Sequence, residues 1–235
     1  MKLKAEILPI ERLSAGDVDV MNGLMDASYE NISRKIFEED LFEKDWVILL
    51  KGDGRIRGFS TLLFYEYRAA DGPVRIVFSG DTIIEAKSRG SMALHAAWAR
   101  FVLPRALDPT KPPLYWFLIC KGYKTYRYLP VFLKEFYPSF RTPTPSFEHR
   151  LMIDLAQQRY GKRVDASRGI IKSDPEHDRL KAGVAEISPR RRRDPHVAYF
   201  ESINPGHAEG DELICLGALR ADNLRPKILR VLSWD

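Results

Sequence analysis

The chain has 235 residues, of which 45% are hydrophobic and 29% charged, a balance that allows a substantial core and excludes a disordered chain. It has no run of about 18 apolar residues and no apolar leader, so neither a membrane span nor secretion is predicted and a cytoplasmic protein is expected. The net charge of +5 includes four consecutive arginines at residues 190–193.

The first half of the chain predicts a strand, two helices, three strands, and then a helix–strand–helix. Ser14 and Asp17 have the spacing of a capping box, which starts a helix. Short Gly-containing turns separate the next three strands, so these form an antiparallel meander. The predicted strands cover residues 4–10, 46–50, 56–67, 74–84 and 114–120, and the predicted helices cover residues 14–29, 34–42, 90–103 and 123–136.

The second half of the chain is less regular. A helix is predicted at residues 146–159, after a Pro-rich linker, and residues 163–194 are polar with weak periodicity. Two apolar runs then predict a hairpin with a long loop, and a short helix follows. The hairpin strands are residues 197–203 and 213–219, and the last helix is residues 224–231.

Three ranges organise the chain: a core at residues 1–145, a helical or irregular extension at 146–194, and a hairpin with a short helix at 195–235 that completes the same domain. The extension has too few apolar positions for a core of its own, so we expect it to pack on the rest of the chain and cover part of a binding cleft.

Few motifs point to particular chemistry. Cys120 and Cys215 lie in apolar runs, where cysteine is usually a small buried hydrophobe, so neither a disulfide nor a metal site is predicted. The arginines at 190–193 form either a solvated loop or a surface for an acidic partner such as nucleic acid, a carrier protein or phosphates. Without a zinc-finger, RNP-type or helix-turn-helix pattern, nucleic-acid binding is not the favoured interpretation.

The element order resembles the GNAT superfamily of N-acyltransferases, and the stretch Ile84-Glu-Ala-Lys-Ser-Arg-Gly-Ser-Met-Ala-Leu94 carries the resemblance. The family's fourth strand ends in a loop that binds the donor's pyrophosphate, with Arg or Gln, two residues, Gly, one residue, and Gly or Ala. Here Arg89-Gly90 falls where the family often has Arg-Gly, whereas Met92 and Leu94 depart from the small-residue positions.

The resemblance implies an α/β (α+β) fold with a mixed, mostly antiparallel sheet flanked by helices, in which the strands at 74–84 and 114–120 run parallel and splay apart. It implies transfer of an acyl group to a small-molecule amine from acetyl-CoA or acyl-CoA, or from an acyl carrier protein, without a metal. Backbone N–H groups at a helix N-terminus suit phosphates. The implied donor-binding residues are Ile83, Ile84, Lys87, Arg89, Gly90 and Ser91.

The implied chemistry needs a base for the ammonium proton and an acid for the leaving thiolate. Asp81 and Glu85 stand near the end of the fourth strand, so either is a candidate base. The family often uses a tyrosine as the acid, but Phe132 occupies that position, which leaves Tyr126 and Tyr128 as substitutes. Two alternatives stay open: a catalytically silent module that binds a ligand or partner, and nucleic-acid binding through residues 190–193.

Overall fold

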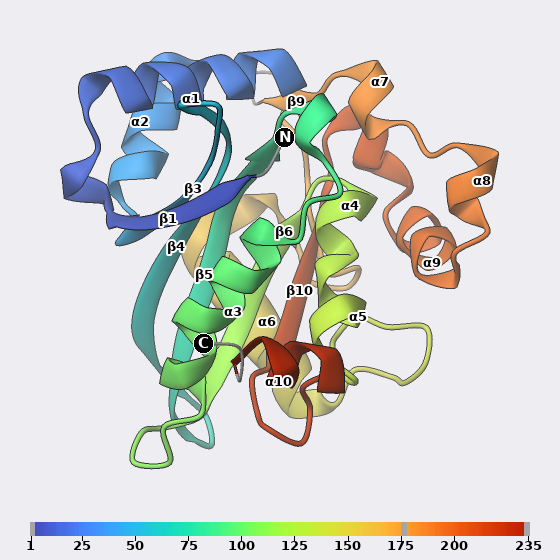
Figure 1. Cartoon of the computed structure of the whole chain (residues 1–235). Coiled ribbons are helices and arrows are strands. Elements are labelled where there is room, and N and C mark those ends of the chain that lie inside the picture. The colour runs from blue at the N-terminus through green and yellow to red at the C-terminus, as the bar shows by residue number, and fades with distance from the viewer. Residues whose placement is uncertain (1–2, 175–177, 233–235) are drawn as a thin grey trace.

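An eight-stranded mixed sheet forms the centre of the computed structural model, which describes residues 3–174 and 178–232 (Figure 1). The strands are β1 (Lys4–Pro9), β2 (Tyr29–Glu30), β3 (Trp46–Gly52), β4 (Arg55–Ala69), β5 (Gly72–Ile84), β6 (Leu114–Cys120), β7 (Val164–Asp165), β8 (Ile170–Ile171), β9 (Arg179–Leu180) and β10 (Glu212–Ala218). Their order in the main sheet is β1-β3-β4-β5-β6-β10-β8-β7, and β2 pairs with β9 in a separate two-stranded sheet.

Helices flank both faces of the sheet. They are α1 (Ala15–Ser28), α2 (Arg34–Phe42), α3 (Ala93–Ala106), α4 (Tyr123–Tyr126), α5 (Tyr128–Phe132), α6 (Ser146–Tyr160), α7 (Ala182–Ala185), α8 (Pro189–Arg192), α9 (Pro195–Ile203) and α10 (Pro226–Leu232). Four 3-10 turns complete the structure: η1 (Ile10–Arg12), η2 (Ala86–Ser88), η3 (Gly161–Arg163) and η4 (Pro205–Glu209). No helix of the described ranges is long and apolar enough to cross a membrane.

Successive side chains of a strand point to opposite faces of the sheet, so the residues of one strand pack into two different cores. In β3, Ile48 and Leu50 join α3, α9 and α10 on one face, whereas Val47 and Leu49 join α1 and α2 on the other. Further along the sheet α6 covers this second face, where its Leu151 packs with residues of β5, β6 and β10. Figure 1 shows α3 and α10 in front of the sheet and α6 behind it.

The predicted topology of the central strands is confirmed. β3, β4 and β5 form an antiparallel meander, and β5 and β6 run parallel with α3 as the crossover. Their pairing begins with Arg75 opposite Leu114 and stops with Ser79 opposite Leu118, so the ends of the two strands separate. This mixed, mostly antiparallel sheet with one splayed parallel pair has the arrangement that the resemblance implied.

The predicted hairpin at residues 197–203 and 213–219 is wrong, because its first half is helix α9. Asp194 caps this helix by accepting from the backbone N–H of His196 at 2.9 Å, and Pro195 occupies its first turn. Val197 and Phe200, three residues apart, face the core. The second half is strand β10, which pairs antiparallel with β6 instead.

The single helix predicted at residues 123–136 is also corrected. Two short helices, α4 and α5, end at Phe132, and the chain then extends so that Leu133 bridges to Leu224 and Tyr137 to Leu216. Gly217 permits this crossing, since a Cβ there would collide with the Leu133 side chain. A tertiary contact therefore overrides the helical spacing of the apolar residues.

The range 146–194 packs on the rest of the chain and contributes strands to the sheet. Helix α6 begins at Ser146, as predicted, and ends where Gly161 takes φ = 55°. Strands β7 and β8 extend the sheet beyond β10. The pair β2–β9 ties this range to the end of α1, where Arg179 Nε and Glu30 Oε2 are 2.8 Å apart. Both cysteines are buried free thiols.

Candidate active site

A cavity of about 780 Å³ opens where β5 and β6 separate. Its walls include Asp81 from β5, Lys121 and Tyr128 from the segment after β6, Arg159 from the end of α6, and Asp178 beside β9. The splayed strands therefore leave a space that segments far apart in the chain line together.

Asp81 stands at an irregularity in β5. Ser60 pairs with Thr82 and Leu62 with Ser79, so Thr61 alone lies opposite both Gly80 and Asp81. A bulge of this kind frees backbone groups from the ladder and re-aims a side chain. Gly80 is required because a Cβ would lie 2.5 Å from Thr61 Oγ1 and 2.8 Å from Lys44 Cε.

The surroundings of Asp81 favour its protonated form. Burial raises its pKa most, the charges of Asp40 and Asp178 raise it further, and Lys121 and Lys44 oppose them, which leaves a pKa of about 7. A carboxylate with a pKa near neutrality can accept and release a proton at physiological pH. Asp81 is thus placed in the cavity with the acidity that a general base requires.

One group of charges surrounds Lys121 at the end of β6. Its Nζ lies 2.5 Å from Asp178 Oδ2 and 3.8 Å from Glu212 Oε1, and Arg163 Nη2 lies 3.9 Å from Glu212 Oε2. Burial alone would lower the pKa of Lys121, but Glu212 and Asp178 outweigh it and raise that pKa. Burial, Asp81, Asp178 and Glu212 raise the pKa of Tyr29 well above its ordinary value, so its hydroxyl stays protonated beside them.

A second group joins α2 to the end of α6. The Arg159 Nη2 atom donates to Asp40 Oδ1 at 2.9 Å and to Glu43 Oε2 at 2.8 Å, and its guanidinium lies 4.7 Å from the Phe78 ring centre. Lys44 Nζ lies 2.7 Å from Asp40 Oδ2, and its side chain is fully buried. We call the part of the cavity lined by Asp81 and by members of these two groups the acceptor half, after the role proposed for it below.

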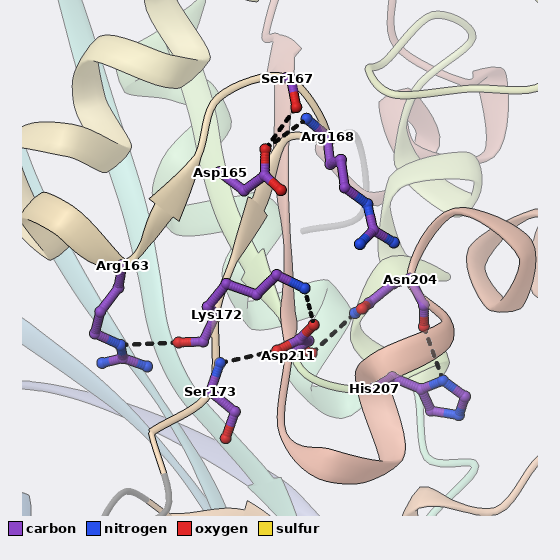
Figure 2. A network of polar contacts seen from close by, with 9 residues as sticks. All are labelled: Arg163, Asp165, Ser167, Arg168, Lys172, Ser173, Asn204, His207 and Asp211. Atoms are coloured by element: carbon purple, nitrogen blue, oxygen red, sulfur yellow. Dashed lines mark hydrogen bonds and ion pairs between the residues drawn. The ribbon is translucent and has the colours of Figure 1, made fainter.

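A network of hydrogen bonds adjoins Arg163, which lines the acceptor half (Figure 2). Asp211 accepts from Lys172 Nζ at 2.8 Å and from the Ser173 N–H at 2.9 Å, while its carbonyl accepts from Asn204 Nδ2 at 2.9 Å. Burial would raise the pKa of Asp211, but these bonds from Lys172 and Ser173 outweigh it and lower that pKa. The Lys172 carbonyl accepts from Arg163 Nε at 3.0 Å, so the β7–β8 hairpin fixes an arginine of the cavity wall.

The opposite part of the cavity, the donor half, contains the predicted phosphate loop in part. Ile83, Ile84 and Arg89 line the wall, and Arg89 Nε donates to the Ile84 carbonyl at 3.2 Å. Gly90 has φ = +94°, a conformation that favours glycine. Ser91 Oγ accepts from the first amide of α3, that of Ala93, at 3.2 Å. Lys87, Gly90 and Ser91 are not cavity-lining residues but lie on the loop at its edge.

The two departures from the family motif do not fill the donor half. Leu94 is 4% exposed and faces the core, whereas Met92 is 57% exposed. Neither residue lines the cavity.

An exposed basic surface borders the donor half. Lys124 on α4 lines the cavity with Arg89, and its Nζ donates to the Val184 carbonyl at 3.1 Å. Burial, Arg89 and Arg191 lower the pKa of Lys124. Arg192 is held by both carboxylate oxygens of Glu201 and is therefore the neutralised member of the run.

The two candidate tyrosines occupy different environments. Tyr128 lines the cavity, burial raises its pKa to about 12, and its ring meets that of His95 edge-on at 4.8 Å. Tyr126 lies in the core against Phe136, and its hydroxyl donates to the Pro138 carbonyl at 2.9 Å. The structure therefore separates Tyr126 from the cavity, because the chain turns between α4 and α5.

Glu85, like Tyr126, lies outside the cavity. Its Oε2 lies 3.2 Å from Arg57 Nη1 on β4, and the residue does not line the cavity. Sequence reasoning missed Lys121, Arg159, Asp178 and Glu212, since their partners lie in distant segments and no local spacing marks them. In the described ranges, no three His, Cys, Asp or Glu residues are placed to hold a metal ion.

No protein family model matches this chain, and no curated protein matches it in sequence. Solved structures with a similar arrangement include a mutant AtaT toxin bound to the C-terminus of the antitoxin AtaR, which is 17% identical with a TM-score of 0.35 over 55% of this chain and 80% of that chain. YhbS from Escherichia coli, a GNAT family N-acetyltransferase in complex with CoA, is 15% identical with a TM-score of 0.35 over 52% and 65% of the two chains.

A protein of Enterococcus faecalis described as a probable N-acyltransferase is 9% identical, with a TM-score of 0.43 over 93% of this chain and 66% of that chain. All three TM-scores are below 0.5, so these likenesses carry no argument about activity. The case for function rests on the cavity itself.

Proposed function

We propose that this chain is an N-acyltransferase that moves an acyl group from a CoA or carrier-protein thioester to an amine. The observation that carries the proposal is Asp81, which stands on the β5 bulge in a cavity between splayed parallel strands and has a pKa of about 7. An alkylammonium has a pKa of roughly 10, about three units above that of Asp81, so transfer of its proton to ionised Asp81 costs about 4 kcal/mol and releases the amine nucleophile transiently.

The reaction then balances with one further proton transfer. The neutral amine attacks the thioester carbonyl, a C–N bond forms, and the carbonyl oxygen becomes an oxyanion that a freed backbone N–H of the bulge would stabilise. Collapse breaks the C–S bond. Tyr128 gives its hydroxyl proton to the thiolate and recovers one from the new amide nitrogen, while Asp81 releases its proton to solvent.

The donor half supports a thioester carried on a phosphorylated arm. Arg89 and Lys124 line the cavity, Lys87 lies on the same loop as Arg89, and Arg191 is close enough to lower the pKa of Lys124. Lys87 and Arg191 are exposed and form no ion pair with another described residue. Hydrogen bonds to a charged group contribute roughly 1.5–3 kcal/mol each. Either the diphosphate of CoA or the phosphopantetheine of an acidic carrier protein would complement this surface.

Thiol release from acetyl-CoA, longer acyl-CoAs and acyl carrier protein, measured with a panel of amines, tests the activity. Calorimetry of CoA binding to the wild type, Arg89→Glu, and the control Arg150→Glu tests the donor half, since Arg150 is exposed on α6 outside the cavity wall. We expect Arg89→Glu to weaken binding at least about tenfold and the control to leave it unchanged. If no thioester binds or releases thiol, the catalytically silent module replaces this proposal.

A further inference from the structure

Among the described residues, the charges of the acceptor half form two balanced groups, and Asp81 belongs to neither. Arg159 and Lys44 face Asp40 and Glu43, two positive charges against two negative charges. The Arg159 side chain is 24% exposed and that of Lys44 is 0% exposed. Breaking these ion pairs would therefore leave charges that water cannot solvate well, at a large cost in free energy. The α2–α6 group is therefore electrically complete.

The ion pairs between described residues of the second group show the same balance. Lys121 and Arg163 face Asp178 and Glu212, again two charges of each sign. The side chains of Lys121 and Glu212 are only 16% and 13% exposed. Each cation that reaches the acceptor half from the described residues is thus already bound to a carboxylate.

Asp81 differs from the carboxylates of these two groups. It lines the cavity, and no hydrogen bond or ion pair joins it to another described residue, although Asp40 and Asp178 are close enough to raise its pKa. A ligand that brings one positive charge would neutralise ionised Asp81. A ligand that also brings a carboxylate or phosphate would have to displace an existing ion pair and leave that pair's carboxylate buried without a partner.

We propose that the acceptor is a cationic amine that carries no carboxylate or phosphate group, such as an alkyl diamine or an aryl-alkylamine. This inference rests on the proposed function, because it assigns the occupant of the same cavity. Specificity then arises because the described residues of the acceptor half include no cation free to pair with the carboxylate of an amino acid, so amino acids bind less favourably than amines.

Matched pairs of acceptors that differ only by a carboxylate test this inference. They are 1,5-diaminopentane against lysine and tyramine against tyrosine, each compared by kcat/KM for thiol release and, without donor, by calorimetry. We expect the amine of each pair to exceed the amino acid by at least about tenfold in both measurements. Equal or better use of the amino acids overturns the inference and leaves the acyltransferase proposal standing.

The binding measurement keeps the inference testable if no acyl transfer is found, a result that would count against the proposed function alone. If neither amine binds, the inference fails as well. The variant Asp178→Asn removes the nearer of the two carboxylates that pair with Lys121, so it should shrink the preference or reverse it toward the amino acids. Asp154→Asn, which removes an exposed carboxylate on α6 outside the cavity wall, should keep the wild-type ratio. A ratio that is unchanged in folded Asp178→Asn would contradict the role given to the Lys121 pair.

Discussion

Replacing Asp81 with asparagine should remove acyl transfer and stabilise the protein, with a gain that depends on pH. The pKa of Asp81 rises from 3.8 to about 7 on folding, so the folded state binds more protons than the unfolded chain between these values. Stability of the wild type therefore falls as pH rises through this window. At about 1.4 kcal/mol for each tenfold change in acidity, the ionised carboxylate costs the fold up to about 4 kcal/mol above pH 7.

Asparagine cannot ionise, so Asp81→Asn escapes this cost. The linkage relation gives a gain of at most about 2 kcal/mol at pH 5 and about 4 kcal/mol at pH 8. Urea unfolding at both pH values, followed by tryptophan fluorescence, measures the difference. Glu85→Gln is the control, since it removes a carboxylate near the end of the same strand that is paired with Arg57. If the gain in Asp81→Asn were equal at pH 5 and pH 8, the raised pKa would be refuted.

Four further substitutions test separate parts of the structure. Gly80→Ala should shift the bulge, because its Cβ would lie 2.5 Å from Thr61 Oγ1, and we expect a loss of about 1–3 kcal/mol in urea unfolding. Asp194→Ala removes the cap of α9 and should cost about 1 kcal/mol by the same assay, whereas an unchanged midpoint would contradict the cap. Tyr128→Phe should lower kcat with little change in donor affinity, because its hydroxyl lies in the cavity. Tyr126→Phe should cost about 1 kcal/mol of stability and leave kcat unchanged, because its hydroxyl is bonded in the core. The reverse pattern would exchange the roles of the two tyrosines.

The parts of the fold that depend on local signals could be predicted from the sequence. The capping box of Ser14 and Asp17 marks the start of α1, and the continuous apolar run of β6 marks a strand buried on both faces. The helix between β5 and β6 required a parallel crossover, which the structure has. The strand predicted at residues 197–203 was wrong because the apolar residues there suit either a strand or a helix. The helix start signal of Asp194 and Pro195 decides between them.

The candidate site also combines residues that the sequence indicates with residues that only the folded structure reveals. Asp81, a candidate from its place near the end of the fourth strand, and Tyr128, a candidate from its place near Phe132, both line the cavity. In the sequence, Tyr126 is as good a candidate as Tyr128, and Glu85 as good a candidate as Asp81. Only the folded chain gives the members of each pair different environments. The pairs Arg159–Asp40 and Lys121–Asp178 join residues 119 and 57 positions apart, so no spacing rule reaches them.

The position of β10 has a consequence for how the molecule folds. Of the strands in the described residues this one comes last, yet it lies inside the sheet between β6 and β8. During synthesis, one edge of β6 stays without its partner until residues 212–218 have left the ribosome, and that edge belongs to a nearly all-apolar strand. Open apolar edges pair readily with other chains. Incomplete chains of this protein are therefore expected to need protection from aggregation until the last strand closes the sheet.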